Sequence, residues 1–117
     1  MKTCKSVLLA DASQEFLTLL GPVLEETGRY SVHFSRSGKE VLSAIRQLRP
    51  DILVLDAVLP DLNGLEVLRQ VKTAALCLSS VVSWRLQAEA EALGAVFLQK
   101  PVTQTLLLET LADLADA

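Results

Sequence analysis

Five short apolar runs alternate with segments of helical character, and this alternation constrains the fold more than any other feature of the chain. The runs cover residues 6–10, 30–34, 51–56, 75–78 and 95–98. Segments with capping residues or apolar residues at helical spacing begin at 13 and 37, cover 64–72 and 85–93, and begin again at 103. Strict alternation of this kind predicts a doubly wound α/β fold, with a five-stranded parallel sheet, five helices on its two faces and right-handed crossovers.

Length and composition predict one domain over residues 1–117. Half of the residues are hydrophobic and only 4% are aromatic, so the core is expected to be mainly aliphatic. The net charge of -3 argues against nucleic acid as a direct partner. The two cysteines, Cys4 and Cys77, imply no disulfide framework, and we expect a reducing, cytoplasmic location. No apolar run reaches transmembrane length, so we expect no membrane partner.

The first helix is expected to begin at a capping serine and to turn one apolar face to the sheet. Ser13 precedes this helix, and its hydroxyl can accept a backbone N–H bond. Four apolar residues then recur at the spacing of one helical face: Phe16, Leu20, Val23 and Leu24. We therefore expect all four to face the core.

Polar residues end four of the five apolar runs. Asp11 follows the first run, Asp56 ends the third, Ser79 follows the fourth and Lys100 lies just beyond the fifth. In a parallel sheet the carboxyl ends of all strands lie at the same edge, where open α/β sheets bind their ligands. The four side chains are therefore expected to converge on one shallow site.

Two carboxylates beside a lysine and a hydroxyl suit phosphate chemistry. The carboxylates and a backbone carbonyl offer oxygen ligands to Mg²⁺, a hard cation that prefers them. One carboxylate can attack phosphorus and form an acyl phosphate. The lysine and the hydroxyl can then bind the phosphoryl oxygens.

These residues resemble the motifs of a known family, the receiver domains of two-component response regulators, over essentially the whole chain. The segment that begins at Asp56, Asp-Ala-Val-Leu-Pro-Asp-Leu-Asn-Gly, keeps the family's spacing from the phosphoacceptor to the following Asn-Gly. Further matches are the acid that ends the first strand, the switch hydroxyl, the Gly-Ala pair, the switch aromatic and the Lys-Pro pair: Asp11, Ser79, Gly94-Ala95, Phe97 and Lys100-Pro101.

The resemblance implies a role for each matching residue. Asp56 is expected to accept a phosphoryl group from a sensor histidine kinase or a phosphotransfer protein, and Lys100 to bind that group. Mg²⁺ is expected on Asp11, Asp56 and the backbone carbonyl of Val58. Ser79 and Phe97 are expected to report phosphorylation to an output partner that binds the face formed by residues 85–93, 95–98 and the last helix.

Two departures from the family pattern affect these expectations. The family normally has a second acid directly after the first, and this acid is usually the direct Mg²⁺ ligand. Ala12 occupies that position, so we expect weaker Mg²⁺ binding and slower phosphorylation. The connection from Gly94-Ala95 to Phe97 is also one residue short, although Phe97 keeps its distance from Lys100.

Two valines bear on the lifetime of a phosphoryl group at Asp56. In the family, the side chains two positions after the phosphoacceptor and two after the switch hydroxyl influence attack by water. Here they are Val58 and Val81, and neither can orient a water molecule. We therefore expect slow loss of the phosphoryl group unless a phosphatase assists.

Structural interpretations of the same residues remain open. Lys100 and Asp56 are also consistent with a structural ion pair, and Asp11 with a cap on the first helix. Ser79, and Ser80 beside it, are also consistent with ordinary loop hydroxyls, and Phe97 with the core. Four further residues have open interpretations. Asp61 is expected to be a solvated loop acid, Trp84 a loop residue that either packs or contacts a partner, and Leu106 or Leu108 part of a dimer or partner surface.

Two other functions compete with the phosphoacceptor interpretation. A degenerate receiver that binds proteins independently of phosphate is supported chiefly by Ala12. A small hydrolase or cofactor binder on the same fold has little support, because the sequence has no Gly-rich phosphate loop and no nucleophile elbow. We therefore expect a signalling module and not an enzyme.

Overall fold

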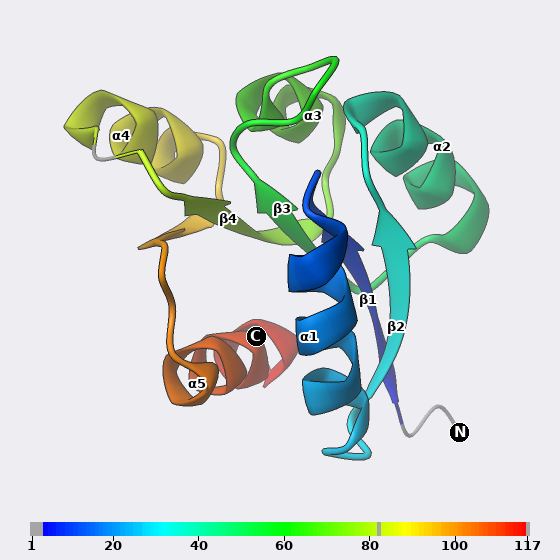
Figure 1. Cartoon of the computed structure of the whole chain (residues 1–117). Helices are drawn as coiled ribbons and strands as arrows, with labels where there is room; N and C mark the ends of the chain where they lie inside the picture. Colours follow the sequence, from blue (N-terminus) through cyan, green and yellow to red (C-terminus); the bar gives the residue numbers. More distant parts are fainter. Residues whose placement is uncertain (1–3, 82, 117) are drawn as a thin grey trace.

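The computed structural model describes residues 4–81 and 83–116 (Figure 1). Strands and helices alternate strictly along these residues. Their bounds are β1 (Lys5–Ala10), α1 (Gln14–Glu25), β2 (Tyr30–Ser35), α2 (Gly38–Leu48), β3 (Ile52–Asp56), α3 (Gly64–Gln70), β4 (Ala74–Ser79), α4 (Trp84–Ala92), β5 (Val96–Gln99) and α5 (Gln104–Asp116). The predicted α/β alternation is confirmed, with each strand within one residue of its predicted bounds.

The strands form one parallel sheet in the order β2-β1-β3-β4-β5. Helices α2, α3 and α4 cover one face, and α1 and α5 cover the other (Figure 1). The domain is therefore doubly wound, as predicted. The order changes direction between β1 and β3, which places the ends of these two central strands side by side.

Two apolar cores lie on the two faces of the sheet, because side chains alternate along each strand. In β3, Leu53 and Leu55 belong to the core under α2, α3 and α4, whereas Ile52 and Val54 belong to the core under α1 and α5. All four are at most 1% exposed. Burial on both faces explains why the sequence of β3 is an unbroken apolar run and does not alternate between apolar and polar residues.

The start of α1 confirms one expectation and corrects another. The Ser13 hydroxyl caps the helix by accepting the backbone N–H of Phe16 at 3.2 Å. The predicted core face is shifted, however, because Leu17 is 1% exposed while Phe16 and Val23 are only partly buried. Helical spacing alone leaves the centre of such a face uncertain by one position, and contact with the sheet determines it.

Asp61 is an exposed loop acid, as the sequence suggested, but it also makes specific hydrogen bonds. Its carboxylate accepts the backbone N–H groups of Gly38 at 2.7 Å and Lys39 at 3.0 Å, which are the first residues of α2. The bond from Gly38 is the main cause that lowers the pKa of Asp61. Asp61 therefore ties the loop after β3 to the start of α2, where the helix dipole favours a negative charge.

Burial of β3 predicts a large cost for truncating its side chains. Leu53→Ala should lower the free energy of unfolding by about 2–5 kcal/mol, because the cavity lies in a core that cannot fully collapse. Urea denaturation followed by circular dichroism measures this cost. Leu19→Ala is the matched control, since Leu19 is 72% exposed and should change stability by about 0.5 kcal/mol or less. Equal effects of the two substitutions would contradict the assignment of Leu53 to the core.

Candidate functional site

Three of the predicted site residues meet at one edge of the sheet. Asp11 follows β1, Asp56 ends β3 and Lys100 follows β5. The Lys100 ammonium donates to Asp11 Oδ2 and to Asp56 Oδ2, each at 2.6 Å. The expected convergence of these three side chains is therefore present, although they are 89 and 44 residues apart in the chain.

Lys100 remains positively charged in this setting. Partial burial lowers its pKa, but the bonds to Asp11 and Asp56 and the charges of both acids raise it more, so the net shift is upward. A raised lysine pKa leaves the ammonium protonated at neutral pH and lets it deprotonate only above its ordinary value of 10.5. The two carboxylates and one ammonium together carry a net charge of -1.

The second oxygen of each carboxylate is held by the backbone two residues further on. Asp11 Oδ1 accepts the N–H of Ser13 at 2.8 Å, and Asp56 Oδ1 accepts the N–H of Val58 at 2.7 Å. These Asx-type turns fix the side-chain torsions of both acids. Asp11 thus holds the backbone of Ser13 and pairs with Lys100 at the same time. The cap of α1 is Ser13 and not Asp11, which corrects the cap interpretation of Asp11.

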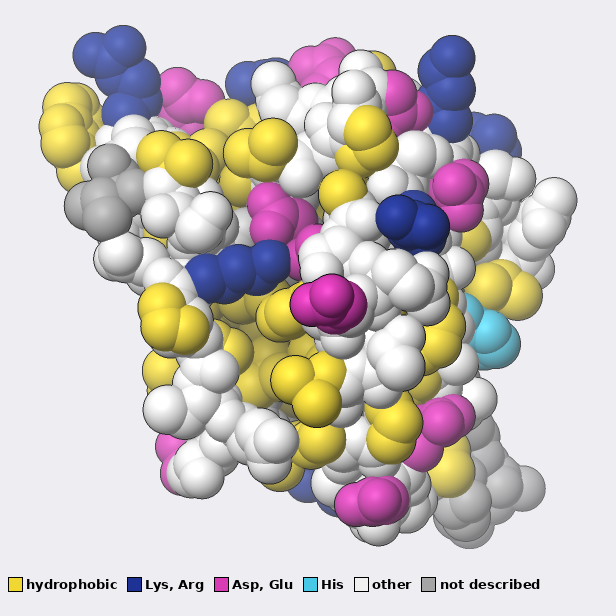
Figure 2. All heavy atoms as spheres, in the orientation of Figure 1, with side chains coloured by type: hydrophobic (Ala, Val, Ile, Leu, Met, Phe, Trp, Pro, Cys, Tyr) yellow, Lys and Arg dark blue, Asp and Glu magenta, His cyan; other side chains and the backbone are white. Residues whose placement is uncertain are grey.

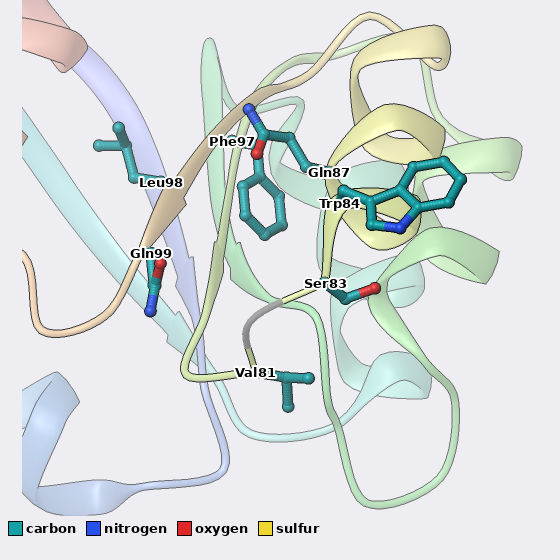
Figure 3. A pocket seen from close by; sticks show the side chains of 7 residues that line it. All are labelled: Val81, Ser83, Trp84, Gln87, Phe97, Leu98 and Gln99. Atoms are coloured by element: carbon teal, nitrogen blue, oxygen red, sulfur yellow. The ribbon is translucent and has the colours of Figure 1, made fainter.

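Ser79 and Phe97 lie near the site but do not contact the carboxylates through any bond among the described residues. The Ser79 side chain is fully buried, and its hydroxyl accepts the N–H of Val81 at 3.0 Å. Figure 3 shows the Phe97 ring pointing into a hollow of about 390 Å³ between β5 and α4. Phe97 is partly buried against the core, so its switch role remains a prediction.

Trp84 is the first residue of α4 and not part of the preceding loop, which corrects the predicted helix start of Arg85. Its indole ring points away from Phe97 (Figure 3). The side chain is 77% exposed, and its neighbour Arg85 lies over the ring at 5.7 Å. This exposure argues against core packing for Trp84, and its role as a partner contact remains a prediction.

Two contacts of the site were not anticipated from the sequence. The Phe16 ring faces the Lys100 ammonium, with 4.2 Å between Nζ and the ring centroid. The Arg36 guanidinium donates to the carbonyl of Ala12 at 3.0 Å and so reaches the loop between β1 and α1. Neither residue belongs to a motif, and the helical spacing of Phe16 suggested a core position.

Comparison with known proteins identifies the family. Residues 7–112 match the model of the response regulator receiver domain. The chain belongs to this family. The polar-differentiation response regulator DivK of Brucella anthropi is 26% identical to it over 122 residues, which cover 97% of this chain and 98% of DivK. The structure of the chemotaxis response regulator CheY4 of Vibrio cholerae superposes with a TM-score of 0.87 at 28% identity, covering 96% of this chain and 99% of that one.

Other relatives are much longer than this receiver domain. The sensory/regulatory protein RpfC of Xanthomonas campestris pv. campestris is 33% identical over 119 residues, which cover 93% of this chain but only 16% of RpfC. The alkaline phosphatase synthesis transcriptional regulatory protein PhoP of Bacillus subtilis is 38% identical over 68 residues, 58% of this chain and 28% of PhoP. What is shared with these proteins is the receiver domain of two-component signalling.

The acidic site of this receiver domain is poor in metal ligands. Receiver domains typically bind Mg²⁺ at their acidic site, but among the described residues no group of three or more Asp, Glu, His or Cys side chains is arranged to hold a metal. Ala12 contributes a methyl group, and both carboxylates already share the charge of Lys100. This donor set does not fit a tightly held Mg²⁺, so the predicted ligands Asp11, Asp56 and the Val58 carbonyl can support weak binding at most.

Gly64 allows the start of α3 to pack directly against the backbone of Asp56 and Ala57. A Cβ atom at Gly64 would lie 2.8 Å from the carbonyl oxygen of Asp56 and 2.9 Å from Ala57 Cα, both of which are backbone atoms. The N–H of Gly64 donates to the Ala57 carbonyl at 2.7 Å. The glycine of the Asn-Gly pair is therefore needed, because α3 begins in direct contact with the backbone that carries Asp56.

No helix in the described ranges 4–81 and 83–116 has both the length and the apolar character that crossing a bilayer requires.

The buried thiol of Cys77 should be inert in the folded protein. Burial, with a further contribution from the charge of Asp56, raises its pKa from 9.0 to about 12, so almost no thiolate forms at neutral pH. We expect Cys4, which is only partly buried, to react with a thiol reagent at pH 8 while Cys77 reacts only after denaturant is added. Labelling followed by peptide mass analysis distinguishes them. Rapid labelling of Cys77 in the native protein would contradict its buried placement in β4.

Proposed function

We propose that this receiver domain accepts a phosphoryl group on Asp56 from a sensor histidine kinase or a phosphotransfer protein and signals through a partner. The observation that best supports this proposal is the paired carboxylate of Asp56 at the open edge of the sheet. Its side chain is 13% exposed, and its Oδ2 atom lies 2.6 Å from a lysine that stays charged. An acid at this depth that also reaches solvent is suited to chemistry.

The transfer requires little from the protein beyond positioning and charge. An oxygen of Asp56 attacks the phosphorus of a phosphohistidine, an O–P bond forms, the N–P bond breaks, and the imidazole keeps the electron pair and takes up a proton from solvent. The acyl phosphate adds negative charge beside Asp11. The Lys100 ammonium, already bonded to both acids, is placed to hold the phosphoryl oxygens.

Output is proposed through the face formed by α4, β5 and α5. Exposed large apolar side chains occur on all three elements, and the most exposed is Trp84 at 77%. Val96 on β5 is 37% exposed and Leu106 on α5 is 42% exposed, whereas Leu108 packs against the core. Of the two leucines considered for a partner or homodimer surface, Leu106 is therefore the better candidate.

Phosphorylation of Asp56 is directly testable. After incubation with acetyl phosphate and Mg²⁺, intact mass should increase by about 80 Da, and Asp56→Asn should abolish the increase. Asp61→Asn is the matched control, because Asp61 lies in the same loop and, within residues 4–81 and 83–116, its carboxylate bonds only backbone N–H groups of α2 and of its own loop. This control should be phosphorylated like the wild type.

A second candidate function is a phosphate-independent interaction module, which Ala12 and the closed pairing of both acids with Lys100 favour. In that case no mass increase should occur at any Mg²⁺ concentration or with candidate kinases, and a magnesium titration should detect no binding near millimolar concentrations. An increase that survives in Asp56→Asn would instead contradict the choice of phosphoacceptor.

The valines beside the site predict a long-lived acyl phosphate. Val58 is 61% exposed and Val81 is 50% exposed, and each presents only methyl groups where a polar side chain could orient water. Val58→Asn should shorten the half-life of the phosphorylated protein by about tenfold, because a positioned polar group assists attack by water. Decay of the phosphorylated mass measures it, with Val96→Asn on β5 as the control. A half-life of seconds for the wild type would contradict this expectation.

A further inference from the structure

The Lys100 ammonium has a third neighbour besides the two carboxylates. The face of the Phe16 ring lies 4.2 Å from Nζ, well inside the range of about 6 Å over which cation–π attraction acts. The Lys100 side chain is 18% exposed, so the contact is partly shielded from water. Two acids and one ring therefore surround the cation that the phosphoryl group is expected to meet.

The segment that holds Asp11 also holds Phe16. The Ser13 N–H donates to Asp11 Oδ1 at 2.8 Å, and the Ser13 hydroxyl accepts the N–H of Phe16 at 3.2 Å. Phe16 then lies in the first turn of α1, where the cap fixes its backbone. The carboxylate and the ring thus approach Lys100 from one short, hydrogen-bonded segment, so their positions relative to the ammonium are coupled.

The ring and the lysine also border an apolar hollow. Phe16 and Lys100 line a hollow of about 420 Å³ together with Leu19, Ser80, Pro101 and Val102. Figure 2 shows hydrophobic side chains gathered in a hollowed region between α1 and α5, as these helices are placed in Figure 1. Without the ring, this hollow would be larger, and the ammonium would have more room to be hydrated from it or to swing into it.

The position of Ala12 increases the importance of the ring. A receiver domain with a second acid at this position has one more negative group. That group restrains the cations of the site, either directly or through a bound metal. Here that group is a methyl. The face of an aromatic ring carries partial negative charge, so Phe16 supplies part of the missing attraction without adding a formal charge.

We propose that Phe16 is a positioning residue that holds the Lys100 ammonium over Asp56 for phosphoryl transfer. This inference rests on the proposed phosphoacceptor function and adds a residue to it. Phe16 does not touch the reacting atoms; it acts by restricting the lysine that does. Phe16 also packs against the edge of the core under α1 and α5, but that packing alone does not require the face of the ring to be turned to a cation.

The test combines a spectroscopic measurement with a rate. In the wild type, the ring current of Phe16 should shift the Lys100 Hε resonances upfield in NMR spectra, and Phe16→Leu should abolish this shift. Phe16→Leu should also slow phosphorylation by acetyl phosphate by about three- to tenfold. Phe16→Tyr keeps the aromatic face and should retain both the shift and a rate within about twofold of the wild type.

Phe34→Leu is the matched control, because Phe34 is 48% exposed on the edge strand β2 and its ring packs over Gly21. It should leave both measurements unchanged. An unshifted Lys100 signal in the wild type would overturn the contact, and equal rates for the wild type and Phe16→Leu would overturn the positioning role. A wild type that is never phosphorylated would instead contradict the proposed function, and the NMR shift, which needs no phosphoryl group, would still decide whether Phe16 holds Lys100.

Discussion

The pairing of Lys100 with Asp11 and Asp56 is the interaction on which the rest of the site depends. Three charged side chains that are 82% or more shielded from solvent must neutralise one another, since an unpaired charge in this position would cost several kcal/mol. Each side chain comes from a different strand end. The ion pairs form only if β1, β3 and β5 end side by side at one edge of the sheet. The register of the strands therefore determines whether the three charges can pair.

Short hydrogen-bonded turns hold the paired side chains in place at the points where the strands end and the loops begin. Asp11 and Asp56 each bond a backbone N–H two residues further along, and Asp61 bonds the start of α2. Gly64 lets α3 begin against the backbone of Asp56. The loops around the site are therefore built from the same polar residues that form the motif, which explains why the motif extends beyond the reacting acid.

The charge balance of the site distinguishes this receiver domain from the pattern that its family implies. With Ala12 in place of an acid, the carboxylates are balanced more closely by Lys100, and the attraction for a divalent cation is reduced. Phe16 reaches Lys100 from α1, and Arg36 reaches the carbonyl of Ala12 from the end of β2. Phe16 and Arg36 thus supply contacts around a site that has fewer metal ligands than the family pattern implies.

The sequence by itself determined the α/β alternation, the strand ends and the group formed by Asp11, Asp56 and Lys100. These follow from local patterns, because apolar runs define strands and a parallel sheet aligns their carboxyl ends. Only the tertiary structure decided which face of α1 is buried, that Asp61 bonds the start of α2 and that Phe16 contacts Lys100. Such contacts join segments far apart in the chain and depend on small rotations and side-chain torsions, for which helical spacing and residue type carry no signal.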